Sequence, residues 1–203
     1  MTDIRELDAR AVRASVAVVA AVTTADLTRP TPCSGWTLGD LLTHMTAQHN
    51  GLAAAAAGQG GDLAAWRVAR PGIDPAGDYA AAADRVIAAF GEPGVLGRTF
   101  TLPEIAPGLA FPAAQAIGFH FIDYVVHGWD VAQSLGLDYA LEPDLLGAAL
   151  PVAETVPDGE FRLGPGAAFA PRLDPRPDSG ADPMGRVLAL LGRSESPAMS
   201  TES

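Results

Sequence analysis

The sequence predicts an all-α protein, a bundle of four long helices followed by a short C-terminal helix. Apolar residues recur at helical spacing over four long segments, whereas no series of alternating segments indicates an ordered sheet. The chain has 203 residues, 48% of them hydrophobic and 18% charged, which is typical of a globular protein. A chain of this length buries a core without help from a disulfide or a metal ion.

The first two helices are expected over residues 3–25 and 38–57. Between them lies the loop TRPTPCSGWT, whose prolines and glycine interrupt helical structure. Thr37 and Asp40 have the spacing of a helix start, in which each side chain bonds the backbone of the other residue. The second helix is expected to stop at Gly58.

Two further long helices are predicted over residues 76–90 and 112–135. Pro112 stands in the first turn of the latter and Gly136 follows its last turn, which is the usual placement of these two residue types. The intervening stretch RTFTL, residues 98–102, alternates and contains residues common in strands. It predicts a short extended segment at most.

A fifth helix over residues 142–154 and a short last helix over 184–191 complete the prediction. We assign residues 1–156 to a four-helix bundle domain with this added fifth helix. Residues 157–193 hold a connection rich in proline and glycine and the short C-terminal helix, packed on the same domain. Residues 194–203 contain few hydrophobic side chains and are predicted to form a disordered tail.

Charge and composition exclude several classes of protein. With 24 acidic and 13 basic residues the net charge is −11, so no basic surface is expected for nucleic acid or an anionic membrane. Every basic residue is arginine, a bias that suggests a high-GC bacterium of the actinobacterial kind. The N-terminal segment lacks the apolar core of a signal peptide, and the apolar stretch 16–22 is too short to span a bilayer. A cytoplasmic protein is therefore expected.

The four histidines lie on the predicted second and fourth helices, and this distribution is the strongest chemical signal in the sequence. On the fourth helix, Asp123 and His127 are four residues apart and so lie on one face, one turn from each other. A carboxylate and an imidazole placed in this way can hold the same metal ion. His120 and Asp130 continue the same polar strip.

His44 on the second helix is the third candidate ligand. Three protein ligands and one open position form the usual pattern of a catalytic zinc ion. Asp40 and Asp130 would then hydrogen-bond the ligands. Spacing alone favours two other interpretations, namely ion pairs on helix surfaces and histidines buried inside the bundle. His49 is expected to be such a core or rim residue.

Cys33 and the tryptophans near the helix ends have more than one interpretation. A thiol just before a helix N-terminus has a lowered pKa and could act as a nucleophile, but a packing role for Cys33 is the interpretation we favour. Trp36 and Trp129 are expected to pack near the helix ends and to line the mouth of a pocket. Gln48 and Tyr124 are assigned to the same pocket.

Three segments resemble a known superfamily. TPCSGWTLGDLLTHM (31–45), FHFIDYVVHGWDVAQSLG (119–136) and PMGRVLALLGR (183–193) resemble DinB-like proteins, and in particular the metal-binding branch related to mycothiol-dependent maleylpyruvate isomerase. The resemblance implies a four-helix bundle of DinB-like type with a long crossover. It also implies that His44, Asp123 and His127 hold Zn²⁺ or another divalent transition metal.

The chain departs from the isomerase pattern at three points. Asp123 stands where the isomerase has Glu, and His120 stands where it has Arg. The isomerase also has a larger C-terminal domain that supplies active-site groups, whereas residues 157–193 hold only a connection and a short helix. Isomerisation of maleylpyruvate itself is therefore not expected.

The resemblance implies a metal-dependent thiol S-transferase or isomerase. A low-molecular-weight thiol such as mycothiol would be the cosubstrate, ionised by the metal so that it attacks a small electrophilic substrate. His120 or His49 would move a proton. Two alternatives stay open: an enzyme recruited for another reaction, such as secondary-metabolite tailoring without a thiol, and a non-catalytic bundle that binds a metal or a ligand. The protein is expected to be a monomer or a homodimer.

Overall fold

The computed structural model describes residues 2–68, 70–163, 169–174 and 182–194. The chain divides into two compact units, Met1–Ala140 and Leu141–Ser203. The described residues form six α-helices and one small two-stranded hairpin, so the predicted helical fold is confirmed. The domain boundary expected at residue 156 lies one helix further along the chain than this division. The predicted tail, 194–203, lies outside the described residues except for Ser194.

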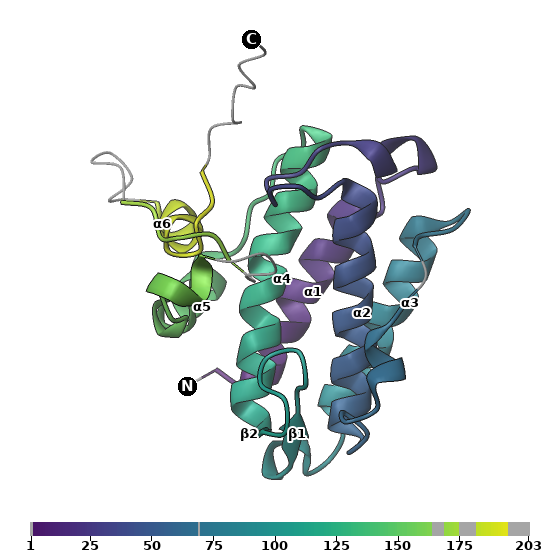
Figure 1. Ribbon diagram of the computed structural model, residues 1–203, viewed down its shortest axis with the longest axis vertical. Helices are drawn as coiled ribbons and strands as arrows, with labels where there is room; N and C mark the ends of the chain where they lie inside the picture. Colours follow the sequence, from purple (N-terminus) through teal and green to yellow (C-terminus); the bar gives the residue numbers. More distant parts are fainter. Residues whose placement is uncertain (1, 69, 164–168, 175–181, 195–203) are drawn as a thin grey trace. The chain divides into compact units, whose positions relative to one another are not determined.

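The first unit is a bundle of four helices (Figure 1): α1 (Ile4–Val19), α2 (Leu38–Ala56), α3 (Pro75–Gly91) and α4 (Ala113–Leu135). α1 packs against α4 and α3, and α2 packs against the same two helices. α4 is buried along most of its length, and its buried residues include histidines and an aspartate. His120, His127 and Asp130 are therefore held inside the bundle, whereas Asp123 is half-buried. No helix in the described part of the chain is long and apolar enough to cross a membrane.

Capping fixes the start of α2 and with it the direction of every side chain on that helix. The Thr37 hydroxyl accepts from the backbone N–H of Asp40, and one carboxylate oxygen of Asp40 accepts from the Thr37 backbone at 3.0 Å. The capping box expected from the sequence is thus confirmed. α1 ends at Val19, earlier than predicted, and Thr24–Thr28 form a short 3-10 helix instead.

A small hairpin precedes α4. β1 (Thr99–Thr101) pairs in antiparallel fashion with β2 (Ala110–Pro112), and Phe100 lies opposite Phe111. β1 falls within the extended segment predicted from the sequence. The loop between the strands carries Glu104, which lies at the site described below.

The second unit contains α5 (Pro143–Thr155), a short 3-10 helix (Gly159–Arg162) and α6 (Pro183–Leu190). α5 and α6 pack on each other. The buried guanidinium of Arg162 donates to the backbone carbonyls of Pro157, Ala170 and Leu190. This single side chain therefore ties the connection after α5 to the end of α6.

Candidate metal centre

Three potential metal ligands meet between α2 and α4. Nε2 of His44 lies 3.7 Å from Oδ2 of Asp123, and Nε2 of His127 lies 3.3 Å from Oδ1 of the same carboxylate. One ligand atom from each of the three residues lies within 4.8 Å of the other two. The structure therefore brings together the three side chains that sequence spacing and resemblance singled out.

The cluster is open on one side and closed on the other. The side chains of His44 and Asp123 are 29% and 20% exposed, whereas that of His127 is 5% exposed. His44 also lines a cleft, whereas Asp123 and His127 are not among its lining residues, so the cluster meets the cleft through His44. This is the arrangement expected of a site that admits a small ligand.

Charge coupling within the cluster is strong. Burial by itself would raise the pKa of Asp123, but His127 and His44 outweigh it and hold the pKa of this carboxyl well below its ordinary value. Burial would lower the pKa of His127, yet the neighbouring Asp123 and Asp130 raise it well above the ordinary value. Both shifts favour the charged form of each partner, so a cation that bound His127 would compete with a proton for it.

Asp130 contacts the other nitrogen of His127. Its Oδ2 lies 2.8 Å from His127 Nδ1 and accepts a second hydrogen bond from Cys33 Sγ at 3.1 Å. Hydrogen bonds of this kind orient a ligating imidazole and fix its tautomer. The position of Asp130 therefore agrees with the role expected for it.

Cys33, His127 and Asp130 form a second group that could bind a metal. Their ligand atoms also lie within 4.8 Å of one another, and all three residues are buried. Cys33 Sγ lies 3.9 Å from His127 Nδ1. Cys33 is not among the residues that line the cleft, so the nucleophile considered for it would not face a ligand bound there.

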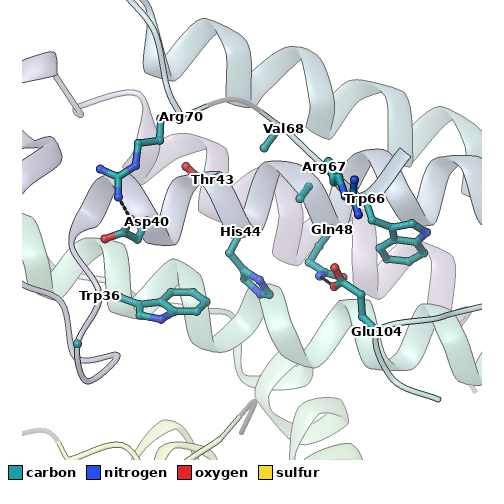
Figure 2. Close-up of a pocket in the computed structure, with 12 residues that line it drawn as sticks. Trp36, Asp40, Thr43, His44, Gln48, Trp66, Arg67, Val68, Arg70 and Glu104 are labelled. Carbon is teal, nitrogen blue, oxygen red and sulfur yellow. Dashed lines mark hydrogen bonds and ion pairs between the residues drawn. The ribbon is translucent and has the colours of Figure 1, made fainter. Parts of the chain in front are cut away.

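The cleft beside His44 has a volume of about 770 Å³ (Figure 2). The Trp36 ring packs edge-on against the His44 ring, with centroids 5.2 Å apart, and Gln48 meets Glu104 on the other side of His44. The lining residues come from the loop before α2, from α2, from the segment after it and from the hairpin: Gly35, Trp36, Asp40, Thr43, His44, Ala47, Gln48, Trp66, Arg67, Val68, Arg70 and Glu104.

One wall of the cleft depends on a close contact between Gly51 and Trp66. A Cβ at Gly51 would lie 2.2 Å from the Trp66 ring, so only glycine leaves room for the indole on α2. The Trp66 indole N–H donates to the carbonyl of Gly60 at 2.8 Å. Trp66 thereby anchors the segment that carries Arg67, Val68 and Arg70.

Asp40 does not meet the ligands in the way expected from the sequence. One of its carboxylate oxygens completes the α2 capping box with Thr37, and the other binds the Arg70 guanidinium. Both groups hold the pKa of Asp40 below its ordinary value, Thr37 more strongly than Arg70. Asp40 lines the cleft, but its described contacts do not include His44.

Two of the four predicted pocket residues, Tyr124 and Trp129, do not line the cleft. Both are buried. The Tyr124 hydroxyl donates to the backbone carbonyl of Met45, and its ring stacks on His49 with centroids 4.1 Å apart. Successive side chains of an α-helix are rotated by about 100° around the helix axis. Residues that follow Asp123 or His127 directly in the sequence therefore point away from the site.

His49 and His120 lie in the interior and contact each other. His49 Nδ1 is 3.1 Å from His120 Nε2, and His120 Nδ1 is 2.6 Å from Asp8 Oδ1. All three side chains are buried, and neither histidine lines the cleft. Burial of His49 agrees with the core position expected for it, and proton transfer by these histidines stays a prediction.

Sequence reasoning missed the lining residues that follow α2 in the chain: Trp66, Arg67, Val68, Arg70 and Glu104. Periodicity carries no information about the path of a loop, so nothing in spacing brings residues 66–70 to α2. The pairing of Gly51 with Trp66 is the one local signal, because a glycine inside a helix marks a place where another group comes close.

The chain is similar to a known protein family and to two known proteins. Residues 9–132 match the family described as mycothiol maleylpyruvate isomerase N-terminal domain. Two uncharacterised proteins of Mycobacterium tuberculosis, from strains H37Rv and CDC 1551 / Oshkosh, are each 34% identical to this chain over 194 residues. Each match covers 91% of this chain and 94% of the relative.

A solved structure is also similar. The crystal structure of the mycothiol-dependent maleylpyruvate isomerase matches with a TM-score of 0.53 and 15% identity, over 75% of this chain and 70% of that one. At this identity the likeness shows the fold alone. The family match covers more than half of the chain and includes His44, Asp123 and His127. The chain therefore belongs to the mycothiol maleylpyruvate isomerase N-terminal domain family.

Proposed function

We propose that this protein is a metal-dependent enzyme that activates a small thiol, such as mycothiol. The activated thiol is transferred to a small electrophilic substrate or brings about the isomerisation of that substrate. The observation that carries the proposal is the convergence of ligand atoms from His44, Asp123 and His127 beside a cleft. Membership of the family and the name of the similar structure support a thiol as the cosubstrate.

Distances within the cluster suit a tetrahedral ion. Bonds of about 2.0–2.1 Å from zinc to nitrogen and oxygen place two ligand atoms about 3.3 Å apart. Nε2 of His127 lies 3.3 Å from Oδ1 of Asp123, and Nε2 of His44 lies 3.7 Å from Oδ2 of the same carboxylate. Small side-chain movements would therefore let these three residues hold one zinc ion.

Comparing interatomic distances with those around a tetrahedral zinc ion also shows what holds Cys33, His127 and Asp130 together. The distances favour hydrogen bonds over metal binding in this group. Asp130 Oδ2 lies 2.8 Å from His127 Nδ1 and 3.1 Å from Cys33 Sγ. Both separations are ordinary for hydrogen bonds and shorter than those between ligands of a tetrahedral zinc ion. The two nitrogens of His127 point to different sides of the ring, so one ion cannot use both groups.

A zinc ion bound by these residues would keep a coordinated thiol ionised at neutral pH. The chain would hold the three ligating side chains in place, and its cleft would bind the rest of the thiol and the electrophilic substrate. Trp36 and Trp66 offer apolar surfaces to the cleft, and Arg67 and Arg70 add positive charge. About 770 Å³ lies within the range of volumes typical of small-molecule sites.

Metal analysis tests the ligand set. Purified protein loaded with zinc and freed of excess should contain one ion per chain by mass spectrometry, and His127→Ala should lose it. His49→Phe is the matched control, because it changes a buried histidine that faces His120 and should keep the ion. Full metal content in the His127 variant would show that the ligand set is wrong.

A thiol-transfer assay tests the activity. Mycothiol and a panel of small electrophiles are incubated with zinc-loaded protein, and thiol adducts or isomerised products are measured by mass spectrometry. Product formation that needs both the zinc and the thiol supports the proposal. Turnover without a thiol would favour the recruited enzyme, and stoichiometric zinc without turnover would favour the non-catalytic bundle.

A further inference from the structure

One carboxylate oxygen links the metal cluster to the single cysteine. Oδ2 of Asp130 accepts from the Cys33 thiol at 3.1 Å and lies 2.8 Å from Nδ1 of His127. Cys33, Asp130 and His127 are all buried, so water does not compete strongly for these bonds. The order of contacts runs from the thiol through the carboxylate to the imidazole.

This chain of contacts determines which nitrogen of His127 can bind a metal. When Nδ1 donates its hydrogen to Asp130, the lone pair of a neutral imidazole lies on Nε2. Nε2 is the atom that faces Asp123 in the cluster with His44. The orientation of the Asp130 carboxylate therefore controls the ligand atom, and Cys33 is a donor to that carboxylate.

The loop before α2 holds Cys33 firmly in this place. The backbone N–H of Trp36 donates to the carbonyl of Cys33 at 3.0 Å, and that of Thr31 donates to the carbonyl of Trp36 at 3.2 Å. Gly35 closes the turn with a φ of +79°, a conformation that favours glycine. The same short loop thus sets Cys33 beside Asp130 and Trp36 beside His44.

We propose that Cys33 is a positioning residue of the metal centre, whose thiol holds Asp130 so that His127 presents Nε2 to the ion. The inference rests on the proposed function, because it needs an ion bound by His44, Asp123 and His127. Cys33 would not ligate the ion itself, since its sulfur lies on the Nδ1 side of the His127 ring.

Cobalt binding to the whole chain gives the test, with Co²⁺ as a spectroscopic substitute for zinc. Three variants are titrated beside the wild type: Cys33→Ala, which loses the donor, Cys33→Ser, which keeps a hydroxyl donor, and Ser34→Ala, a control at the exposed neighbour in the same loop. We expect Cys33→Ala to weaken Co²⁺ binding by about 10- to 100-fold, as for other groups that orient metal ligands. Cys33→Ser should recover part of the loss, and Ser34→Ala should bind as the wild type does.

Melting temperatures of the metal-free proteins separate positioning from a purely structural role. If Cys33 only packs, Cys33→Ala and Cys33→Ser lower the melting temperature while the dissociation constant for Co²⁺ stays unchanged, and the proposal is overturned. A thiolate-to-cobalt charge-transfer band in the wild type that disappears in Cys33→Ala would also overturn it, because Cys33 would then be a ligand.

Failure of the proposed function has a different signature. In that case the wild type binds no Co²⁺, or His44→Ala binds it as tightly as the wild type does. If instead His44→Ala loses the ion while Cys33→Ala retains wild-type affinity, the metal centre stands and only the inference about Cys33 is wrong.

Discussion

His49 is buried in the bundle, and burial changes how readily its imidazole binds a proton. Its ring is enclosed between Tyr79, Tyr124 and His120. Burial, with a smaller effect of the neighbouring His120, lowers the pKa of His49 well below its ordinary value of 6.5. The folded protein thus keeps His49 neutral under conditions in which an exposed histidine is charged.

This shift predicts a loss of stability at acidic pH. Below about pH 6.5 the unfolded chain binds a proton at position 49 that the folded chain does not, so the free energy of unfolding falls as the pH is lowered. The slope from this one group is at most about 1.4 kcal/mol per pH unit. Urea unfolding of metal-free protein between pH 7 and pH 5 should show a steeper fall for the wild type than for His49→Phe.

His127 provides an internal check on the sign. Its raised pKa means that the folded state binds a proton more tightly than the unfolded state, and this stabilisation is lost as the pH rises above 6.5. The titration of His127 therefore changes the free energy of unfolding above pH 6.5, whereas that of His49 changes it below pH 6.5. Equal slopes below pH 6.5 for wild type and His49→Phe would contradict the assignment to His49.

Sequence spacing could place Asp123 and His127 together because both lie on one helix, four residues apart. It could not reveal the partner of His120, because Asp8 lies 112 residues earlier on another helix. Nor could it show that Asp130 is shared with Cys33, 97 residues away. Contacts between distant segments depend on how the helices pack, and periodicity describes only single helices.

At the scale of elements, the contact between Trp66 and α2 holds the outer wall of the cleft. Leu63–Trp66 form a short 3-10 helix whose tryptophan rests on Gly51 and bonds Gly60. Helix periodicity predicts α2 correctly but leaves the position of this segment open. The cleft is thus built from a predictable helix and from a segment whose path only the packing determines.

Gly51→Ala should displace this wall. A Cβ would lie 2.2 Å from the Trp66 ring, so the indole must move, and such overpacking typically costs about 1–3 kcal/mol. Urea unfolding measures the cost, and the fluorescence of the protein should change as an indole shifts. If the variant matches the wild type in both measurements, the segment that carries Trp66 moves freely.

Gly91→Ala is the matched control for that substitution. Gly91 ends α3 and is exposed, and a Cβ there would point into open space among the described residues, with nothing beyond its own helix within 4 Å. Alanine at a position compatible with helical backbone stabilises a protein by about 0.4–1 kcal/mol. The two substitutions should therefore change the free energy of unfolding in opposite directions.

At the scale of the whole molecule, the proposed ion would link two helices of the first unit. His44 belongs to α2, while Asp123 and His127 belong to α4. An ion bound to the folded state alone stabilises it by mass action. The bundle itself was predictable from four apolar periodicities and from a family resemblance, whereas the division of the chain after Ala140 was not, because α5 has a helical pattern like the others.

Zinc should accordingly raise the melting temperature of the protein. At a free zinc concentration about 100 times the dissociation constant, the stabilisation is about 2.7 kcal/mol, and it grows with the logarithm of the concentration. Differential scanning calorimetry over a series of zinc concentrations measures the shift. His127→Ala should show no such dependence, and an equal shift in that variant would point to binding elsewhere.

His127 also divides two environments. One edge of its imidazole meets Asp123, which is partly open to solvent, and the other meets the enclosed carboxylate of Asp130. The ring thus separates a partly exposed carboxylate from an enclosed one, and an ion held on the Asp123 side lies toward solvent. The rate at which chelators of increasing size remove that ion would therefore measure how accessible the site is from solvent, and this measurement does not depend on enzymatic turnover.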